Sequence, residues 1–395
     1  MRILLWSVMM ISILNAQQKT DKDLRELANR LAKEIIIIDT HIDLPGRLQE
    51  KWEDISKRTS GEIDYPRAKA GGLDVPFMSV YVAASFENNG AKEEADDIID
   101  IVEKIAQTYP DKFALAYNVS DIYKNFKSGL ISLPMGMENG SPIEGDLKNL
   151  EYFYNRGIRY ITLAHSKSNH ICDSSYDPKR KWKGLSPFGK EVVKEMNRIG
   201  MMIDVSHITD AAFYQVIELS KSPVIASHSS CRHFTRGWER NMSDDMIKAL
   251  AKNGGVIQIA FPSDFVNQEI RTKDAKNKAA VSAFIKENNL KSDDKKAREF
   301  SRKYQQENHM GFADVSDVVK HINHVVKLVG INHVGLGSDF DGAGDTLPKG
   351  LKDVSYYPNL IYHLLKAGYT VEEITKICGE NLLRVWSQVE KIAGK

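Results

Sequence analysis

Histidines and acidic residues stand repeatedly at the ends of short apolar segments in this 395-residue chain. His41 and Asp43 follow the first segment, and an extended chain points side chains two positions apart in the same direction. Later segments end in further residues of this kind: Glu138, His165, His207, His228 and Asp339. Imidazole together with carboxylate is a donor set that suits zinc, with manganese or iron as alternatives. The residue types therefore indicate a metal site.

The number of candidate ligands favours two metal ions over one. The four histidines and Glu138 exceed the roughly three protein ligands that a single catalytic zinc takes. Two ions that share a bridging carboxylate and a bridging water would use the whole set. Such ions, about 3.5–4 Å apart, activate hydroxide, so the chemistry we expect is hydrolysis.

The chain can bring these side chains together only if the carboxyl ends of its strands meet. Apolar runs rich in Ile, Val and Met predict buried parallel strands at Glu34–Asp39, Gly72–Val82, Ile131–Glu138, Arg159–His165, Met201–His207, Pro223–His228, Gly254–Ala260 and His333–Asp339. Amphipathic patterns predict intervening helices that include Lys92–Gln107, Leu147–Arg156, Ser186–Ile199, Thr209–Leu219 and Ser243–Ala251. The alternation predicts an α/β fold, a (β/α)8 TIM-type barrel with its site at the C-terminal face of the strands. A doubly wound open sheet is the alternative, although no GxGxxG follows the first strand.

The stretch from about residue 264 to 310 departs from this alternation. It follows the seventh predicted strand, is rich in lysine and has long helical patterns (KAAVSAFIKENN, DDKKAREFSRKYQQENH). We interpret it as a helical insertion near the barrel mouth whose charges form a solvated face, with a lid as the alternative. Residues 17–395 are predicted to form one domain that includes this insertion.

Composition and the N-terminus limit partners and location. Lys and Arg number 54 against 53 Asp and Glu, so the chain lacks the basic surface of a nucleic-acid-binding protein. Residues 1–16 resemble a signal peptide, because a positive start and the apolar run Ile3–Leu14 precede Ala16, which suits cleavage. The run is shorter than the about 20 residues of a membrane span, and an N-terminal core helix is the alternative. No cysteine stands near the cleavage point and no apolar tail suggests a GPI anchor. We therefore expect a periplasmic or secreted protein without a membrane anchor.

Three other patterns carry less weight. The segment DFDGAGD after the last strand lacks the acids that complete a calcium-binding loop. His321 and His324 stand three apart on the helix before that strand, where we expect them to lie at the surface or to pack. Ser229 and Ser230 have no GxSxG sequence around them, which argues against a serine nucleophile.

Together, the motifs resemble the renal (membrane) dipeptidase family of zinc peptidases. The resemblance extends from DTHIDLP (39–45) to NLLRV (381–385) and includes GMENG (136–140), RYITLAHS (159–166), IDVSH (203–207), ASHSS (226–230), ERNMSDD (239–245) and GLGSDFDG (335–342). It implies a (β/α)8 barrel, two Zn²⁺ ions with a bridging hydroxide, and dipeptides with a free C-terminal carboxylate as substrates. A homodimer is implied by the resemblance alone.

The resemblance also implies a metal role for five residues of this chain. His41, Asp43 and Glu138 would hold one Zn²⁺. Glu138, His207 and His228 would hold the other, so that Glu138 bridges the two ions.

Three further residues receive roles from the resemblance. His165 would contact the substrate and stabilise the oxyanion, and Asp339 would transfer the proton. Arg240 would bind the substrate carboxylate, with Arg236 as a weaker candidate because the spacing after ASHSS is slightly longer than usual. Mammalian relatives place a tyrosine near the substrate where this chain has Ala260-Phe261-Pro262, so a hydroxyl contact is expected to be missing.

Two other functions are the alternatives. A binuclear barrel amidohydrolase for cyclic amides or lactones typically has HxH on the first strand and a carboxylated lysine on the fourth, whereas this chain has HxD and His165. A non-catalytic exported protein that binds metal or peptide would have no need of Asp339 and His165.

Overall fold

The computed structural model describes residues 20–291 and 294–395, and parallel strands form its centre. The eight-stranded sheet has the order β1 (Ile37–Ile42), β2 (Leu73–Tyr81), β5 (Met135–Glu138), β6 (Ile158–Thr162), β7 (Met202–Asp204), β8 (Ile225–Ser229), β9 (Val256–Ile259) and β10 (Val334–Leu336). Its edges meet through a parallel bridge between Ile42 and Phe340, next to a hydrogen bond of 3.1 Å from the Asp339 amide to the His41 carbonyl. The predicted (β/α)8 TIM-type barrel is thereby confirmed.

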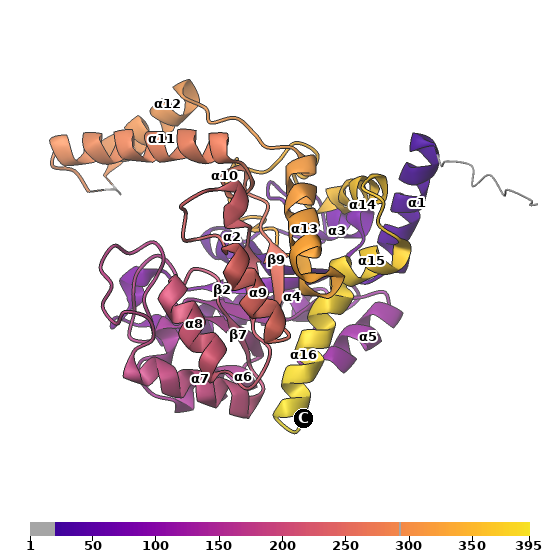
Figure 1. The fold of residues 1–395 in the computed structure, drawn as a ribbon, viewed down its shortest axis with the longest axis horizontal. Helices are drawn as coiled ribbons and strands as arrows, with labels where there is room; N and C mark the ends of the chain where they lie inside the picture. The colour runs from indigo at the N-terminus through magenta and orange to yellow at the C-terminus, as the bar shows by residue number, and fades with distance from the viewer. Residues whose placement is uncertain (1–19, 292–293) are drawn as a thin grey trace, which may run out of the picture.

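Helices surround the barrel (Figure 1). They are α1 (Asp21–Glu34), α2 (Leu44–Glu50), α3 (Tyr65–Gly71), α4 (Ala91–Thr108), α5 (Val119–Lys127), α6 (Lys148–Asn155), α7 (Pro187–Ile199), α8 (Asp210–Leu219), α9 (Asp244–Lys252), α10 (Ser263–Val266), α11 (Gln268–Glu287), α12 (Lys295–Glu307), α13 (Val315–Val329), α14 (Tyr357–Lys366), α15 (Val371–Thr375) and α16 (Asn381–Ile392). The side chains of Ser186, Thr209 and Ser243 cap α7, α8 and α9 at their N-termini, since each accepts a hydrogen bond from a first-turn amide. The five predicted helices correspond to α4, α6, α7, α8 and α9.

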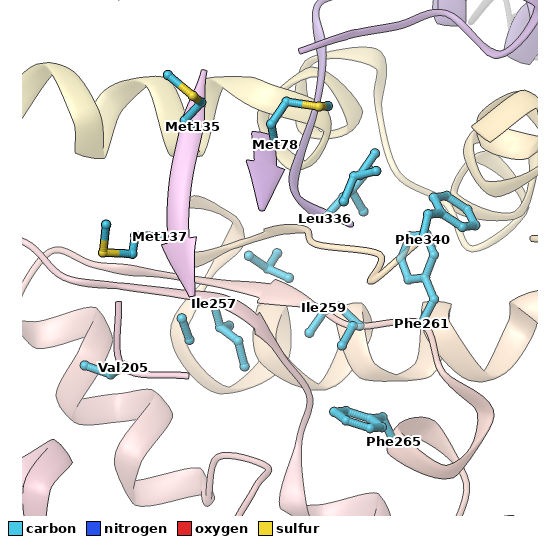
Figure 2. Close-up of a cluster of buried hydrophobic side chains, with 14 of the residues drawn as sticks. Met78, Met135, Met137, Val205, Ile257, Ile259, Phe261, Phe265, Leu336 and Phe340 are labelled. Atoms are coloured by element: carbon cyan, nitrogen blue, oxygen red, sulfur yellow. The ribbon is translucent and has the colours of Figure 1, made fainter. Parts of the chain in front are cut away.

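Apolar strand side chains form the core beneath the site. Met78, Met137, Ile257 and Ile259 are completely buried, as Figure 2 shows for this cluster. All six residues of β1 are buried as well. A parallel strand covered on both faces reads as a continuous apolar run, which explains why the pattern was visible in the sequence.

Several strand predictions were wrong in their limits, and those that ended at His165, His207 and Asp339 each ran three residues past the strand. The run Ile131–Glu138 is two strands, because its first part, β4 (Ile131–Leu133), pairs with β3 (Phe113–Leu115) in a separate two-stranded sheet. Pro134 separates the two parts and has no amide hydrogen for a ladder. The first barrel strand begins at Ile37 and not at Glu34, since α1 runs to Glu34.

The insertion after β9 is helical, as predicted, and consists of α10, α11 and α12. Helices α11 and α12 extend outward beside the barrel as a pair (Figure 1). The rings of Phe284 and Phe300 stack between them with centroids 3.8 Å apart. Only Ile270 is buried in α11 and only Ala297 in α12, which agrees with a largely solvated charged surface.

Two of the predictions concern membranes and export. Among the residues that the structure describes, no helix has the length and apolar character needed to cross a bilayer. The predicted signal peptide, residues 1–16, lies outside the described residues.

Candidate metal centre

The candidate site lies where the barrel strands end. His41 lies in β1, Asp43 directly follows it, Glu138 is the last residue of β5 and His228 lies in β8. Three residues beyond the ends of β6, β7 and β10 stand His165, His207 and Asp339. The ligand atoms of these seven residues form three overlapping groups, and within each group they lie within 4.8 Å of one another. The structure thus brings together every metal and catalytic candidate taken from the strand ends.

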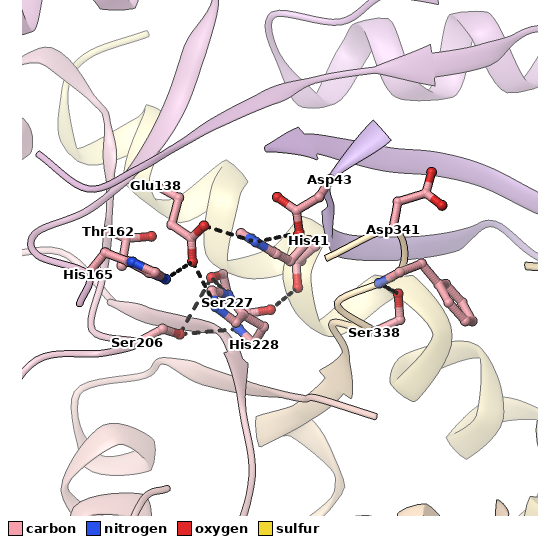
Figure 3. Close-up of polar contacts among 12 residues, drawn as sticks. His41, Asp43, Glu138, Thr162, His165, Ser206, Ser227, His228, Ser338 and Asp341 are labelled. Atoms are coloured by element: carbon pink, nitrogen blue, oxygen red, sulfur yellow. Dashed lines mark hydrogen bonds and ion pairs between the residues drawn. The ribbon is translucent and has the colours of Figure 1, made fainter. Parts of the chain in front are cut away.

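The carboxylate of Glu138 lies in the middle of the histidines (Figure 3). Its Oε1 is 3.1 Å from His207 Nε2 and 3.2 Å from His228 Nε2. The same oxygen is 3.5 Å from His165 Nε2, and Oε2 is 3.6 Å from His41 Nε2. One carboxylate therefore faces four imidazoles with its two oxygens, as a ligand shared between two cations would.

The ring of His41 is held so that Nε2 keeps a free lone pair. Tyr160 donates its hydroxyl hydrogen to the Thr40 carbonyl at 2.8 Å, so its oxygen accepts from His41 Nδ1 at 3.0 Å. This bond places the proton of the neutral ring on Nδ1. Nε2 is buried and has no hydrogen-bond partner among the described residues. A metal ion would satisfy this otherwise unpartnered atom.

A second relay orients His228 in the same way. Ser227 Oγ donates to Asp204 Oδ2 at 2.6 Å and accepts from His228 Nδ1 at 2.8 Å. The Nε2 lone pair of His228 consequently faces Glu138. Carboxylate-backed imidazoles of this kind are typical of metal-binding histidines.

His207 and Arg240 complete this side of the centre. The Nε2 atoms of His207 and His228 are 2.7 Å apart, a contact that requires a shared proton or a cation. Arg240 is buried, with Nη1 donating to Ser229 Oγ at 2.8 Å and Nη2 lying 3.0 Å from His207 Nε2. Its Nε is buried without a partner among the described residues. Arg236, the weaker candidate for the carboxylate site, is exposed and lies outside this group.

The electrostatics favour cation binding. Burial alone would raise the pKa of Glu138, but the neighbouring imidazoles hold it well below its usual range. Burial opposes charge on His41, yet the carboxylates of Glu138 and Asp43 raise the pKa of His41 to about 10. A bound cation would take the place of that proton. For His207 and His228, burial lowers the pKa well below the ordinary value, so both rings stay neutral and keep a lone pair.

Asp43 and Asp339 form a group with His41 that is distinct from the group of His41, Glu138 and His228. Burial raises the pKa of Asp339, and it raises the pKa of Asp43 to about 8. Gly342 lies against both carboxylates, since a Cβ there would be 2.1 Å from Asp43 Oδ2 and 2.8 Å from Asp339 Oδ1. Asp339 and His207 both have left-handed backbone, with φ of 68° each. Non-glycine residues in this conformation cost about 1–3 kcal/mol and concentrate at functional sites.

A cavity of about 980 Å³ opens above the centre. Tyr81, Tyr176 and Lys278 line it together with the candidate ligands. The ring of Tyr81 meets His165 edge-on at 4.9 Å, and Tyr176 lies 5.7 Å from the ring of His207. Burial raises the pKa of each tyrosine to about 12, so both hydroxyls stay protonated and can donate. Although Phe261 follows β9, the cavity does not lack hydroxyl groups.

Sequence reasoning missed the residues that orient the ligands. Tyr160 and Asp204 stand inside the motifs RYITLAHS and IDVSH, but neither motif shows which hydrogen bond its residue makes. Lys278 also went unassigned, because its place in the predicted insertion did not indicate that α11 reaches the cavity wall.

Comparisons with known proteins agree with this arrangement. A sequence profile of the family described as membrane dipeptidase (peptidase family M19) matches residues 25–395. An uncharacterized dipeptidase of Schizosaccharomyces pombe is 32% identical over 374 residues, which are 90% of this chain and 81% of that protein.

Solved structures show the same fold. The probable dipeptidase PvdM from Pseudomonas aeruginosa has a TM-score of 0.84 at 26% identity and covers 94% of this chain and 100% of its own. A metallo peptidase from Rhodobacter sphaeroides, liganded with a phosphinate mimic of the dipeptide L-Ala-D-Ala, has a TM-score of 0.72 at 23% identity over 90% of this chain and 99% of its own.

Proposed function

The chain belongs to the membrane dipeptidase family, peptidase family M19, and from this we propose that it is a zinc-dependent dipeptidase acting on dipeptides with a free C-terminal carboxylate. The observation that carries the proposal is the Glu138 carboxylate, which lies within 3.6 Å of the Nε2 atoms of His41, His165, His207 and His228. A carboxylate shared by several imidazole nitrogens is a donor set suited to two divalent ions.

The metal roles follow from the donor atoms. His41, Asp43 and Glu138 would hold one zinc ion, and Glu138, His207 and His228 the other. The nitrogen and oxygen donors fit zinc, and the unpartnered Nε2 of His41 supports this assignment. When bound, such ions activate water at neutral pH and polarise a carbonyl group.

Arg240 would bind the carboxylate of the substrate. A guanidinium matches the planar geometry of a carboxylate, and burial strengthens such a charge-assisted pair. Its position directly behind His207 would set the scissile bond next to Glu138. A longer peptide has no carboxylate one residue beyond the scissile bond and would leave the guanidinium without an anionic partner. Arg240 would therefore select dipeptides over longer peptides.

His165 and Asp339 would serve the reaction itself. His165 Nε2 points toward Glu138 from the cavity wall, where a donor could stabilise the oxyanion, an effect worth about 2.7–4 kcal/mol. Asp339 lies beside Asp43 and His41, from where it would reach both the attacking water and the leaving amine. Its raised pKa suits a carboxyl that accepts a proton and then delivers it.

Metal removal tests the proposed cofactor. Dialysis against a strong chelator should abolish dipeptide hydrolysis, and about two equivalents of zinc should restore it. Full activity of the metal-free protein would overturn the proposal.

A matched pair of substrates tests the proposed specificity. Gly-Leu should be cleaved with a kcat/KM at least about 10²-fold above that of Gly-Leu-amide, because the amide leaves a buried charge unpaired. In the variant R240A, the ratio of kcat/KM between Gly-Leu and Gly-Leu-amide should become smaller, mainly because KM for Gly-Leu rises. R236A, at an exposed arginine four residues earlier, is the control and should keep this ratio. Equal rates of the wild type on both substrates would reject the carboxylate requirement.

A further inference from the structure

A second group of metal-ligand side chains lies outside the candidate centre. His233 belongs to the short helix η3 (Arg232–Phe234), Asp244 is the first residue of α9, and His324 lies in α13. One ligand atom from each of the three lies within 4.8 Å of the others. Helices α9 and α13 pack against each other on the outside of the barrel (Figure 1).

The ligand atoms of this group lie close enough together to converge on one ion after a small movement of the His233 ring. His324 Nε2 is 2.8 Å from Asp244 Oδ1. The rings of His233 and His324 are stacked, with centroids 4.5 Å apart and planes inclined by 23°. Two atoms bound to one tetrahedral zinc at 2.0–2.1 Å lie about 3.4 Å apart. His233 is exposed, so its ring can turn the short distance that separates the present arrangement from this one.

Ordinary packing explains only part of the group. The pair of His324 and Asp244 links α13 to α9 and does not need a second histidine. Among the described residues, His233 makes no hydrogen bond that would account for its position against His324. The neighbouring cations do not neutralise Asp244, since Arg232, Lys248 and Lys320 are each paired with a different carboxylate.

We propose that His233, Asp244 and His324 bind one zinc ion that is separate from the candidate centre. Two imidazoles and a carboxylate form a three-ligand set in which water completes the coordination. The exposed His233 leaves the ion open to solvent, so it exchanges with free zinc more readily than an ion at the buried centre.

The position of this site gives it a structural effect. Helix η3 lies in the segment that joins His228 in β8 to Arg240. The inner side of this segment is already held by a hydrogen bond of 3.0 Å from the Cys231 amide to His321 Nδ1. Zinc at His233 would attach its outer side to α9 and α13 as well. Because the ion binds only the folded chain, zinc should raise the melting temperature.

Zinc stoichiometry provides the test. The purified chain is equilibrated with buffered low-micromolar zinc, and bound metal per chain is measured for the wild type, H233A and D244N. Each variant should bind one equivalent less than the wild type and should lose the part of the zinc-dependent rise in Tm that this site supplies. H309A, at an exposed histidine outside the group, is the control and should bind as much zinc as the wild type.

The outcomes separate clearly. Equal zinc content in the wild type and H233A overturns the proposal, and so does an equal loss in H309A, which would indicate unspecific binding by surface histidines. Crystals grown with zinc give an independent answer, because anomalous scattering should place an ion within bonding distance of both His233 and His324. Absence of that peak while the buried centre is occupied would reject the site and leave the proposed dipeptidase function untouched.

Discussion

Replacing Gly342 with alanine would test the geometry of the candidate centre without removing any ligand. The new Cβ would lie 2.1 Å from Asp43 Oδ2 and 2.8 Å from Asp339 Oδ1, whereas ordinary contacts begin at 3.4 Å. The carboxylate of Asp43 must therefore move by about 1 Å, which is the difference between 2.1 Å and an ordinary contact distance. The φ angle of Gly342 is not in the left-handed region, so the backbone itself accepts alanine.

The expected loss is large for activity and small for folding. A misplacement of about 1 Å at a reacting centre can lower the rate about 10²-fold, which corresponds to about 2.7 kcal/mol of transition-state stabilisation. The atoms that collide are the ends of side chains, which can rotate away. The free energy of unfolding should thus fall by no more than the roughly 1–3 kcal/mol typical of overpacking.

Dipeptide kinetics, metal content and thermal unfolding of G342A provide the measurement. G46A is the control, because Gly46 lines the same cavity in α2 and a Cβ there meets nothing within 4 Å. Alanine is favoured over glycine in a helix by about 1 kcal/mol, so G46A should keep its activity and unfold at the same or a higher temperature. Wild-type kcat/KM in G342A, or an equal loss in G46A, would refute the reasoning.

Three further predictions follow from the same residues and from one buried histidine. E138Q should lose metal more completely than any other single ligand variant, measured as zinc per chain, because the shared carboxylate contacts every imidazole of the centre; full occupancy in E138Q would reject the bridge. D339N should keep its metal while kcat falls about 10²–10⁴-fold, and an unchanged kcat would remove Asp339 as the proton carrier. Burial lowers the pKa of His321 to about 3, although the hydrogen bond with the Val266 carbonyl opposes this shift. Below pH 6.5 the unfolded chain therefore binds a proton at this histidine that the folded chain does not bind. The free energy of unfolding should consequently fall by about 2 kcal/mol between pH 7 and pH 5 through this group. In H321Q, which cannot titrate here, the free energy of unfolding should depend less on pH over this range. The same pH dependence in H321Q and in the wild type would contradict the assignment.

Local pattern was enough to predict the barrel and the residues at its mouth. Strands buried on both faces appear as apolar runs, and polar residues at their ends stand out against them, as His207 and Asp339 do. The helices were predictable for the same reason, since Ser186 and Ser243 act within one turn of the chain. Where the local signal was ambiguous, the limits were wrong: Ile131–Glu138 reads as one apolar run, but Pro134 divides it between two sheets.

Only the tertiary structure decided how these residues face one another. The proton of His41 is placed by Tyr160, more than 100 positions away in the chain, and that of His228 by Asp204 through Ser227. The sequence predicted only that His321 and His324 lie at the surface or pack, whereas the fold buries His321 and sets His324 against His233 and Asp244. Periodicity reports which face of a strand or helix is buried, but hydrogen bonds between distant segments depend on strand register and loop path. These long-range contacts, which no short window of sequence encodes, turn a set of suitable side chains into a site.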